Sequence, residues 1–359
     1  MHCMKGRCWN WQNRAGQMKG HMTEEMIGQM KEIQMRIDKK QISALSKMGQ
    51  NKALFGVALP ELAGKYTNLF AVTADLCGYC GMGRFARLYP ERTVNVGIQE
   101  QSMLSVAAGL AIEGNIVYAG SYAAFAVARA MEQVRHNLSV LGSNVKLVGY
   151  SAGYTMGILG KSHWATEDLA FTRCLPGMTV LSPADSLEAV KACNAAAEIR
   201  GPVYIRLCGD GGCPAVYHED YAFAVGKAVR LRQGKDAVVI ATGRMVHKAL
   251  MAAELLRGKG IETAVVNMHT LKPLDTAILD ELLDTYCQNG QLFTVEEHSI
   301  IGGLGSAVSE YMTDRGCGRQ LTRLGMQDCH YEIGDENYVW EHAGLLETQI
   351  AETILRRLG

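Results

Sequence analysis

Short apolar runs alternate with helical stretches along most of this chain, and this alternation constrains the fold more than any other feature. From about residue 54 the runs have the length of buried strands: LFAVTAD, RTVNVG, NIVYAG, VKLVGY, MTVLSP and PVYIRL. Short apolar strands separated by helices are typical of parallel sheets with both faces covered. The sequence therefore predicts an α/β fold with mainly parallel sheets flanked by helices.

A polar, glycine-rich connection, CGDGGCPAVYHEDYAF, divides this alternation into two blocks. The pattern then restarts with DAVVIATG, a helical stretch, IETAVVNMHTLKPLD and QLFTVEEHS. We expect one domain at 45–212, a linker at 213–221 and a second domain at 222–359. Residues 1–44 are expected to form an N-terminal tail and a helix, because 1–22 show neither helical nor strand periodicity.

The composition describes a globular protein of 359 residues, with 48% hydrophobic and 20% charged residues. Its 36 basic and 36 acidic residues give no formal net charge, which argues against nucleic acid or an anionic membrane as the main partner. No apolar run approaches a membrane span or a secretion signal, so we expect a cytoplasmic protein. Eleven scattered cysteines favour reduced thiols. The CxxC pair Cys77 and Cys80 lacks a second pair at zinc spacing.

The segment RTVNVGIQEQ carries the most informative polar residue, Glu100. It predicts a short strand, a turn at Gly97 and a helix, so that Glu100 lies in the first turn of that helix. A carboxylate in this position also simply complements the helix dipole. Taken alone, this position favours the dipole role, and the surrounding motif decides whether Glu100 is a site residue.

Other candidate residues follow strands in the same block. Asp75 ends the strand LFAVTAD, where α/β sheets place ligands, although a turn or capping role is an equal alternative. Tyr122 and Phe125 follow NIVYAG at the expected start of a helix, where aromatic residues are usually core residues. His163 lies in a glycine-rich stretch, GYSAGYTMGILGKSHWATED, which favours a catalytic role over a structural one.

Taken together, these motifs resemble the pyrimidine-binding domain of transketolase-like, thiamine-diphosphate-dependent enzymes. The resemblance rests on VGIQEQ around Glu100, on SYAAF ending at Phe125, and on the glycine-rich stretch that contains His163. The motifs KPLD and EEHSIIGGLG resemble the C-terminal domain of the same family. For the three glycines of the latter motif, an anion-binding nest is the alternative to a structural role.

The resemblance implies roles for single residues. Glu100 would hydrogen-bond the aminopyrimidine of thiamine diphosphate and start its chemistry, and Phe125 would stack on that ring. Tyr122, Arg129 and Asp75 would flank the cofactor. His163 would contact substrate oxygens and assist catalysis.

The substrate end departs from the family pattern. Ser151 stands where sugar-phosphate enzymes have His, and Leu159 stands where they have an Asp that binds the donor's hydroxyl. A leucine accepts no hydrogen bond, so the donor or acceptor is open. Arg206 matches an Arg that grips substrate phosphate, and Tyr79 lies near the position of a substrate-binding Ser. We expect His163, Arg206 and Ser151 to bind the substrate.

The implied protein is the second subunit of a split transketolase, which moves a two-carbon ketol unit from a ketose-type donor to an aldehyde acceptor. Gly209-Asp-Gly lacks the following Asn of a magnesium site and is interpreted as an interdomain turn, so no metal ligands are assigned. An N-terminal, diphosphate-binding subunit would supply most of the Mg²⁺ site, in an α2β2 assembly.

Two alternatives stay open at this point. One is the β subunit of a 2-oxoacid dehydrogenase or a relative of deoxyxylulose-phosphate synthase. The other is a non-catalytic regulatory subunit, which the departures at Ser151 and Leu159 suggest.

Overall fold

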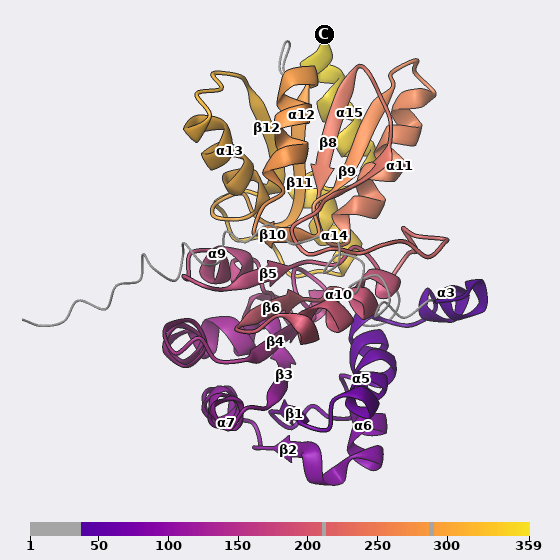
Figure 1. Ribbon diagram of the computed structural model, residues 1–359. Helices are drawn as coiled ribbons and strands as arrows, with labels where there is room; N and C mark the ends of the chain where they lie inside the picture. The colour runs from indigo at the N-terminus through magenta and orange to yellow at the C-terminus, as the bar shows by residue number, and fades with distance from the viewer. Residues whose placement is uncertain (1–36, 210–212, 287–290) are drawn as a thin grey trace, which may run out of the picture. The chain divides into compact units, whose positions relative to one another are not determined.

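The computed structural model describes residues 37–209, 213–286 and 291–359. Residues 37–359 form one compact unit with a seven-stranded and a five-stranded sheet; six strands of the first are coloured indigo to magenta, its strand β10 is orange, and the second sheet is orange to yellow (Figure 1). The expected tail at 1–22 and most of the expected N-terminal helix lie outside the described residues. Helix α3 (Lys39–Leu45) lies inside them and begins with a capping box formed by Asp38 and Gln41.

The first sheet has seven strands in the order β10-β5-β6-β4-β3-β1-β2. The strands are β1 Leu69–Thr73, β2 Thr93–Asn95, β3 Ile116–Tyr122, β4 Val145–Tyr150, β5 Thr179–Leu181, β6 Val203–Arg206 and β10 Thr270–Lys272. All neighbouring strands run parallel except β10, which is antiparallel to β5. Every residue of the central strand β4 is buried, which fits its mostly apolar sequence.

The second sheet has five strands in the order β12-β11-β8-β9-β7. The strands are β7 Val229–Arg232, β8 Ala237–Ala241, β9 Thr263–Asn267, β11 Leu292–Ser299 and β12 Leu321–Met326. Strands β12, β11, β8 and β9 are parallel, and β7 is antiparallel to β9. The predicted fold class, two mainly parallel sheets flanked by helices, is confirmed.

Several helical segments connect and flank these strands. In the first block they are α4 Gln50–Lys52, η1 Ala53–Ala58, α5 Leu59–Lys65, α6 Gly83–Leu88, η2 Pro90–Arg92, α7 Glu100–Ile112, η3 Ala124–Arg129, α8 Met131–Gln133, η4 Val134–Val140, η5 Gly157–Ser162, α9 Asp168–Arg173 and α10 Ser186–Glu198. In the second block they are α11 Met245–Arg257, α12 Thr276–Tyr286, α13 Leu304–Asp314, α14 Glu336–Ala343 and α15 Glu347–Leu358. Asp185 and Asp335 cap α10 and α14, because each side chain accepts a hydrogen bond from a first-turn amide. None of the described helices has the length and apolar character needed to cross a membrane.

The structure corrects the sequence-based picture in two places. Tyr122, expected at the start of a helix, is the last residue of β3 and pairs in register with Tyr150. Strand β10 belongs to the second sequence block but pairs with β5 of the first sheet, with Thr270 opposite Leu181. The domain limits at 212 and 222 stay a prediction.

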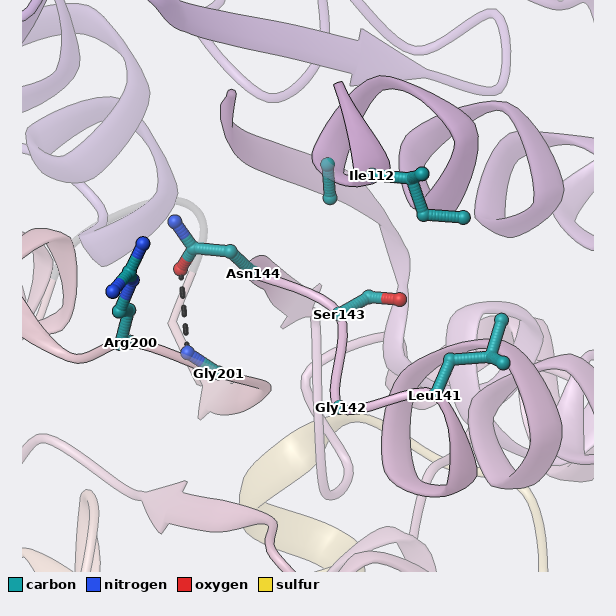
Figure 2. A pocket seen from close by; sticks show the side chains of 8 residues that line it. Ile112, Leu141, Gly142, Ser143, Asn144, Arg200 and Gly201 are labelled. Carbon is teal, nitrogen blue, oxygen red and sulfur yellow. Dashed lines mark hydrogen bonds between the residues drawn. The ribbon is translucent and has the colours of Figure 1, made fainter. Parts of the chain in front are cut away.

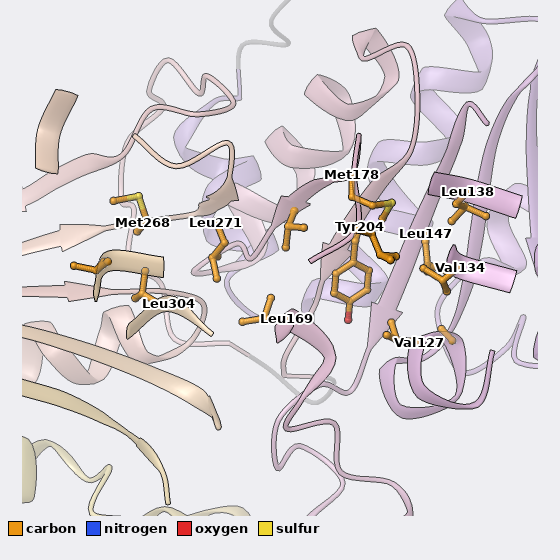
Figure 3. Packing of buried hydrophobic residues seen from close by; sticks show 14 of the residues in the cluster. Val127, Val134, Leu138, Leu147, Leu169, Met178, Tyr204, Met268, Leu271 and Leu304 are labelled. Carbon is orange, nitrogen blue, oxygen red and sulfur yellow. The ribbon is translucent and has the colours of Figure 1, made fainter. Parts of the chain in front are cut away.

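One hydrophobic core continues across both sequence blocks (Figure 3). Leu147 and Tyr204 come from the first sequence block, whereas Met268, Leu271 and Leu304 come from the second block. All five side chains are at most 2% exposed. Burial of each such side chain contributes roughly 1.5–3 kcal/mol, so the shared core holds the two sequence blocks together.

Candidate active site

Glu100 lies at the junction of a strand and a helix. The chain leaves β2, turns at Gly97 with a φ of 77°, and enters α7 with Glu100 as its first residue. The Glu100 side chain is only 2% exposed. Ser121 Oγ donates a hydrogen bond to its Oε1 at 3.2 Å, and Arg129 donates one to its Oε2 at 2.9 Å. A buried carboxylate is costly unless it is paired, so these two partners stabilise it in this position.

Phe125 and Tyr122 provide an aromatic surface beside this carboxylate. Tyr122 ends β3 and Phe125 lies in the helical segment that follows, and both are half-buried. Their ring centroids are 5.8 Å apart in an edge-to-face arrangement. The Arg129 guanidinium carbon lies 3.9 Å from the centroid of the Phe125 ring. Glu100, Phe125 and Arg129 therefore form one contiguous group, and their contact with a cofactor stays a prediction.

His163 joins the same group from the loop after η5. Its ring centroid lies 5.1 Å from that of Phe125 and 6.0 Å from that of Tyr122. The hydroxyl of the neighbouring Ser162 lies 3.0 Å from His163 Nδ1. The half-buried imidazole thus lies beside the aromatic surface, in a position to contact a substrate bound over it.

Ser151 and Tyr79 lie beside the same aromatic surface. Ser151 is buried, has a φ of 54° and lies directly after β4. The Tyr79 hydroxyl is 3.4 Å from Ser151 Oγ, and the Tyr79 ring centroid is 5.1 Å from that of Tyr122. Sequence reasoning noted Tyr79 only as the occupant of a serine position. The sequence signal that could have identified Tyr79 as a site residue is its place shortly after the carboxyl end of β1.

Asp75 lies at the carboxyl end of the β1–β2 pair, with a φ of 63°. Its backbone amide donates to Asn95 Oδ1 at 3.0 Å, and Asn95 Nδ2 donates to Asp75 Oδ1 at 3.1 Å. The Asp75 side chain is exposed. These contacts show that Asp75 stabilises a turn, which was one of its two expected roles. The other role, contact with a cofactor, stays a prediction.

The structure contradicts the expected substrate role of Arg206. Its side chain is 1% exposed and forms a buried ion pair with Asp168, with Nε 2.9 Å from Oδ2. The Nη2 atom of Arg206 donates to the backbone carbonyls of Ala165 and Glu297. Burial alone would lower the pKa of Arg206, but Asp168 raises it above its ordinary value. Because its donors bind interior acceptors, Arg206 joins the two sequence blocks instead of gripping a substrate.

Glu297 of β11 ties the loop that carries His163 to the second block. Its Oε1 accepts hydrogen bonds from the Tyr154 amide at 3.0 Å and from Trp340 Nε1 at 2.9 Å. Burial raises the pKa of the Glu297 carboxyl. Trp164, next to His163, donates to the Gly157 carbonyl at 3.1 Å. The contact with β11 and the bond within the loop therefore position it.

Gly157 packs closely against the backbone of Gly334 and Asp335. Replacing Gly157 with alanine tests whether this close packing stabilises the fold. A Cβ at Gly157 would lie 2.8 Å from the Gly334 carbonyl oxygen and 3.2 Å from the Asp335 backbone, which no side-chain rotation relieves. We expect Gly157→Ala to lower the free energy of unfolding by about 1–3 kcal/mol, measured by urea denaturation. Gly109→Ala is the control, because a Cβ there meets nothing within 4 Å. Equal effects of the two substitutions would contradict the close docking.

The glycine-rich turn after β11 has a structural role. Glu296 accepts hydrogen bonds from the amides of Leu304 at 2.6 Å and Gly305 at 2.8 Å. Burial raises the pKa of Glu296 to about 7, and burial lowers the pKa of the adjacent His298 to about 4. A Cβ at Gly303 would collide with the Glu296 carboxylate. The turn's amides thus bind an internal carboxylate, which favours the structural role over an external anion site.

The CxxC pair shows no features of a reactive or metal-binding site. Burial raises the pKa of Cys80 to about 12 and also raises the pKa of Cys77, whereas reactive thiols have lowered values. Both are free thiols. Within the described ranges, no three His, Cys, Asp or Glu side chains group as metal ligands.

A separate pocket of about 310 Å³ opens at the amino ends of β4 and β6 (Figure 2). Ile112, Leu141, Asn144 and Arg200 contribute to its lining, and the Gly201 amide donates to Asn144 Oδ1 at 3.4 Å. The candidate site lies at the opposite, carboxyl ends of the strands. Ligands of parallel α/β sheets bind at the carboxyl ends, so we assign no function to this pocket.

The candidate site suits a flat, nitrogen-containing ring. Glu100 offers carboxylate oxygens to N–H donors, and Phe125 offers a ring face. The guanidinium of Arg129 shows that a planar cationic group fits between them, because it contacts both. These features define a two-domain α/β protein with a candidate ligand site at the carboxyl ends of its first sheet.

Comparison with known proteins identifies the family. Residues 48–209 match the transketolase pyrimidine-binding domain, and residues 226–350 match the transketolase C-terminal domain. The chain belongs to the transketolase family, whose members use thiamine diphosphate.

Its relatives include separate transketolase subunits. A putative transketolase C-terminal section from Methanocaldococcus jannaschii is 39% identical over 306 residues, which cover 85% of this chain and 95% of the relative. A 6-deoxy-6-sulfo-D-fructose transketolase subunit from a Clostridium species is 40% identical over 294 residues, covering 81% and 89%. A solved split-gene transketolase, an inactive β4 tetramer, has 37% identity and a TM-score of 0.77, covering 87% of this chain and 98% of that chain.

Proposed function

We propose that this chain is the pyrimidine-binding subunit of a two-subunit transketolase that transfers a two-carbon ketol unit from a ketose-type donor to an aldehyde acceptor. The proposal rests on one observation, the grouping of Glu100, Phe125 and His163 at the carboxyl ends of the first sheet. Thiamine diphosphate, when bound, supplies the carbon nucleophile that carries the ketol unit.

The residues of this chain have separate tasks in this proposal. Glu100 holds a proton between its Oε2 atom and the pyrimidine ring nitrogen, from a buried position that keeps water away. Phe125 orients the pyrimidine by stacking, and Tyr122 supports Phe125 edge-on. His163 donates to or accepts from substrate oxygens beside the aromatic surface. Ser151 and Tyr79 form the polar part of the substrate end.

A second chain completes the active site in this proposal. The matched domains are the pyrimidine-binding and C-terminal ones, so the diphosphate group and Mg²⁺ would be held mainly by an N-terminal subunit in an α2β2 assembly. The solved relative supports this division, because it is a β4 tetramer and inactive. The isolated chain is therefore expected to have no transketolase activity.

The substrate is expected to differ from common sugar phosphates. Arg206 is held in the interior, Ser151 replaces a histidine, and the half-exposed Leu159 offers no hydrogen bond to a donor hydroxyl. A relative acts on a sulfonated ketose, which supports a non-standard substrate for this chain.

A donor and acceptor screen of the reconstituted complex tests the proposed function. The donors are a ketose 6-phosphate, the 6-sulfonated ketose and the unmodified ketose, each offered with glyceraldehyde 3-phosphate or unphosphorylated glyceraldehyde. Ketol transfer with at least one pair supports the proposal. No transfer from any ketose, together with decarboxylation of a 2-oxo acid, would contradict it and favour the 2-oxoacid dehydrogenase alternative.

A further inference from the structure

Arg129 covers the two groups that the proposed cofactor needs. One guanidinium nitrogen donates to Glu100 Oε2 at 2.9 Å, and the guanidinium carbon lies 3.9 Å from the Phe125 ring centroid. A planar, cationic group thus pairs with the carboxylate and stacks on the ring. An aminopyrimidine that pairs with Glu100 and stacks on Phe125 requires the same space and the same acceptor.

We propose that Arg129 is a gate for the cofactor, which must withdraw from Glu100 and Phe125 before the pyrimidine binds. This inference rests on the proposed function, because it takes Glu100 and Phe125 to be the pyrimidine's partners. Its new content is that a side chain of this subunit competes with thiamine diphosphate for one position. Arg129 is then a positioning residue that controls access to Glu100.

The surroundings allow Arg129 to move while Glu100 stays in place. The Arg129 side chain is 47% exposed, whereas that of Glu100 is 2% exposed and also bound by Ser121. The ion pair uses one guanidinium nitrogen, so it lacks the added strength of a bidentate pair. Solvent at the exposed guanidinium weakens the pair further.

The contacts of its backbone hold Arg129 in place, whereas its guanidinium group can move. Arg129 ends the π-helical segment η3, and its carbonyl accepts a hydrogen bond from Gln101 Nε2 at 3.3 Å. Ala130 follows with φ −103° and ψ 22°, outside helical values. The backbone of Arg129 is therefore tied to α7, and rotation of the side chain alone opens the site.

A gate of this kind lowers the apparent affinity for the cofactor. The measured dissociation constant equals the intrinsic one divided by the fraction of molecules in which Arg129 is withdrawn. Removing the guanidinium leaves nearly all molecules able to bind the cofactor. We expect Arg129→Met to tighten thiamine diphosphate binding by about fivefold or more and to speed its association.

The test titrates thiamine diphosphate with Mg²⁺ into the complex of this chain and its diphosphate-binding partner, by calorimetry and by stopped-flow fluorescence. Arg135→Met is the matched control, because Arg135 forms an exposed pair with Glu132 nearby. Arg129→Lys keeps the charge without the planar surface and is expected to fall between the wild type and Arg129→Met. The wild type should show a binding step whose rate saturates with cofactor concentration, and Arg129→Met should lose it.

The outcomes separate the gate from the proposed function. Tighter and faster binding by Arg129→Met, with Arg135→Met unchanged, supports the gate. Equal or weaker binding by Arg129→Met overturns it. Glu100→Gln reports on the proposed function independently: weakened binding there keeps the function even when the gate fails, whereas unaltered binding removes the basis of both.

Discussion

Replacing Glu100 with glutamine is expected to lower kcat of the reconstituted complex by about 10²–10⁴-fold while the chain stays folded. Glutamine keeps the shape of the buried side chain and its acceptor for Ser121, but it cannot exchange a proton with a bound pyrimidine. Loss of a group that acts on protons in the reaction is expected to reduce kcat more than it raises KM. Steady-state kinetics with the best donor and acceptor pair measures this change.

Glu132→Gln is the control for this substitution, because Glu132 forms an exposed ion pair with Arg135. It should leave kcat within twofold of the wild type, a change of roughly 0.4 kcal/mol. Circular dichroism and the urea midpoint of Glu100→Gln establish that the fold is retained. Full activity of a folded Glu100→Gln complex would refute the assignment of Glu100.

Replacing Arg206 with alanine is expected to lower the free energy of unfolding by about 3–5 kcal/mol. The substitution leaves the Asp168 carboxylate buried without its ion pair, although the Tyr204 hydroxyl still donates to Oδ2 at 2.5 Å. It also removes the Nη2 donor shared by the Ala165 and Glu297 carbonyls. Urea denaturation of the isolated chain measures the change.

The exposed pair of Arg135 and Glu132 provides the comparison, because solvent screens this pair and Arg135→Ala should leave the free energy of unfolding nearly unchanged. A substrate-binding Arg206 would give the opposite pattern: little loss of stability and a large rise in KM for phosphorylated substrates. The two measurements thus distinguish an interior ion pair from a substrate clamp.

The parallel α/β organisation was predictable because buried strands of such sheets are continuous apolar runs. The strands β7 and β12 were missed for the complementary reason. Both lie at edges of the second sheet and carry arginines, such as Arg230 and Arg323, which interrupt the apolar pattern. Charged residues on edge strands protect against pairing with other chains, and they also hide the strand from periodicity analysis.

Site residues were predictable where their position relative to a neighbouring strand or turn in the sequence was enough to place them. Glu100 follows a strand and a turn, and Phe125 follows the next strand, so both could be placed at one sheet edge from sequence. The pairing of Arg129 with Glu100 required the tertiary arrangement of β3 and α7, since 29 residues separate them. The matching position of Arg129 had indicated proximity to the cofactor, but not competition with it.

Arg206 shows why a matched position alone does not establish a role. The sequence contains an arginine at the end of a strand, but it does not show that Asp168, 38 residues earlier, buries and pairs it. Burial of the charged end decides between a structural and a substrate-binding arginine. Glu297 was unassigned for the same reason, because its contacts with Tyr154 and Trp340 join distant segments.

Calorimetric titration of thiamine diphosphate and Mg²⁺ tests the central claim most directly, namely that this chain carries the pyrimidine half of a shared active site. The titration is made with this chain alone, with the diphosphate-binding partner alone, and with their mixture. We predict tight binding in the mixture, much weaker binding to either chain alone, and a large loss of affinity when the mixture contains Glu100→Gln. Equal binding by the partner alone and by the mixture would contradict the claim.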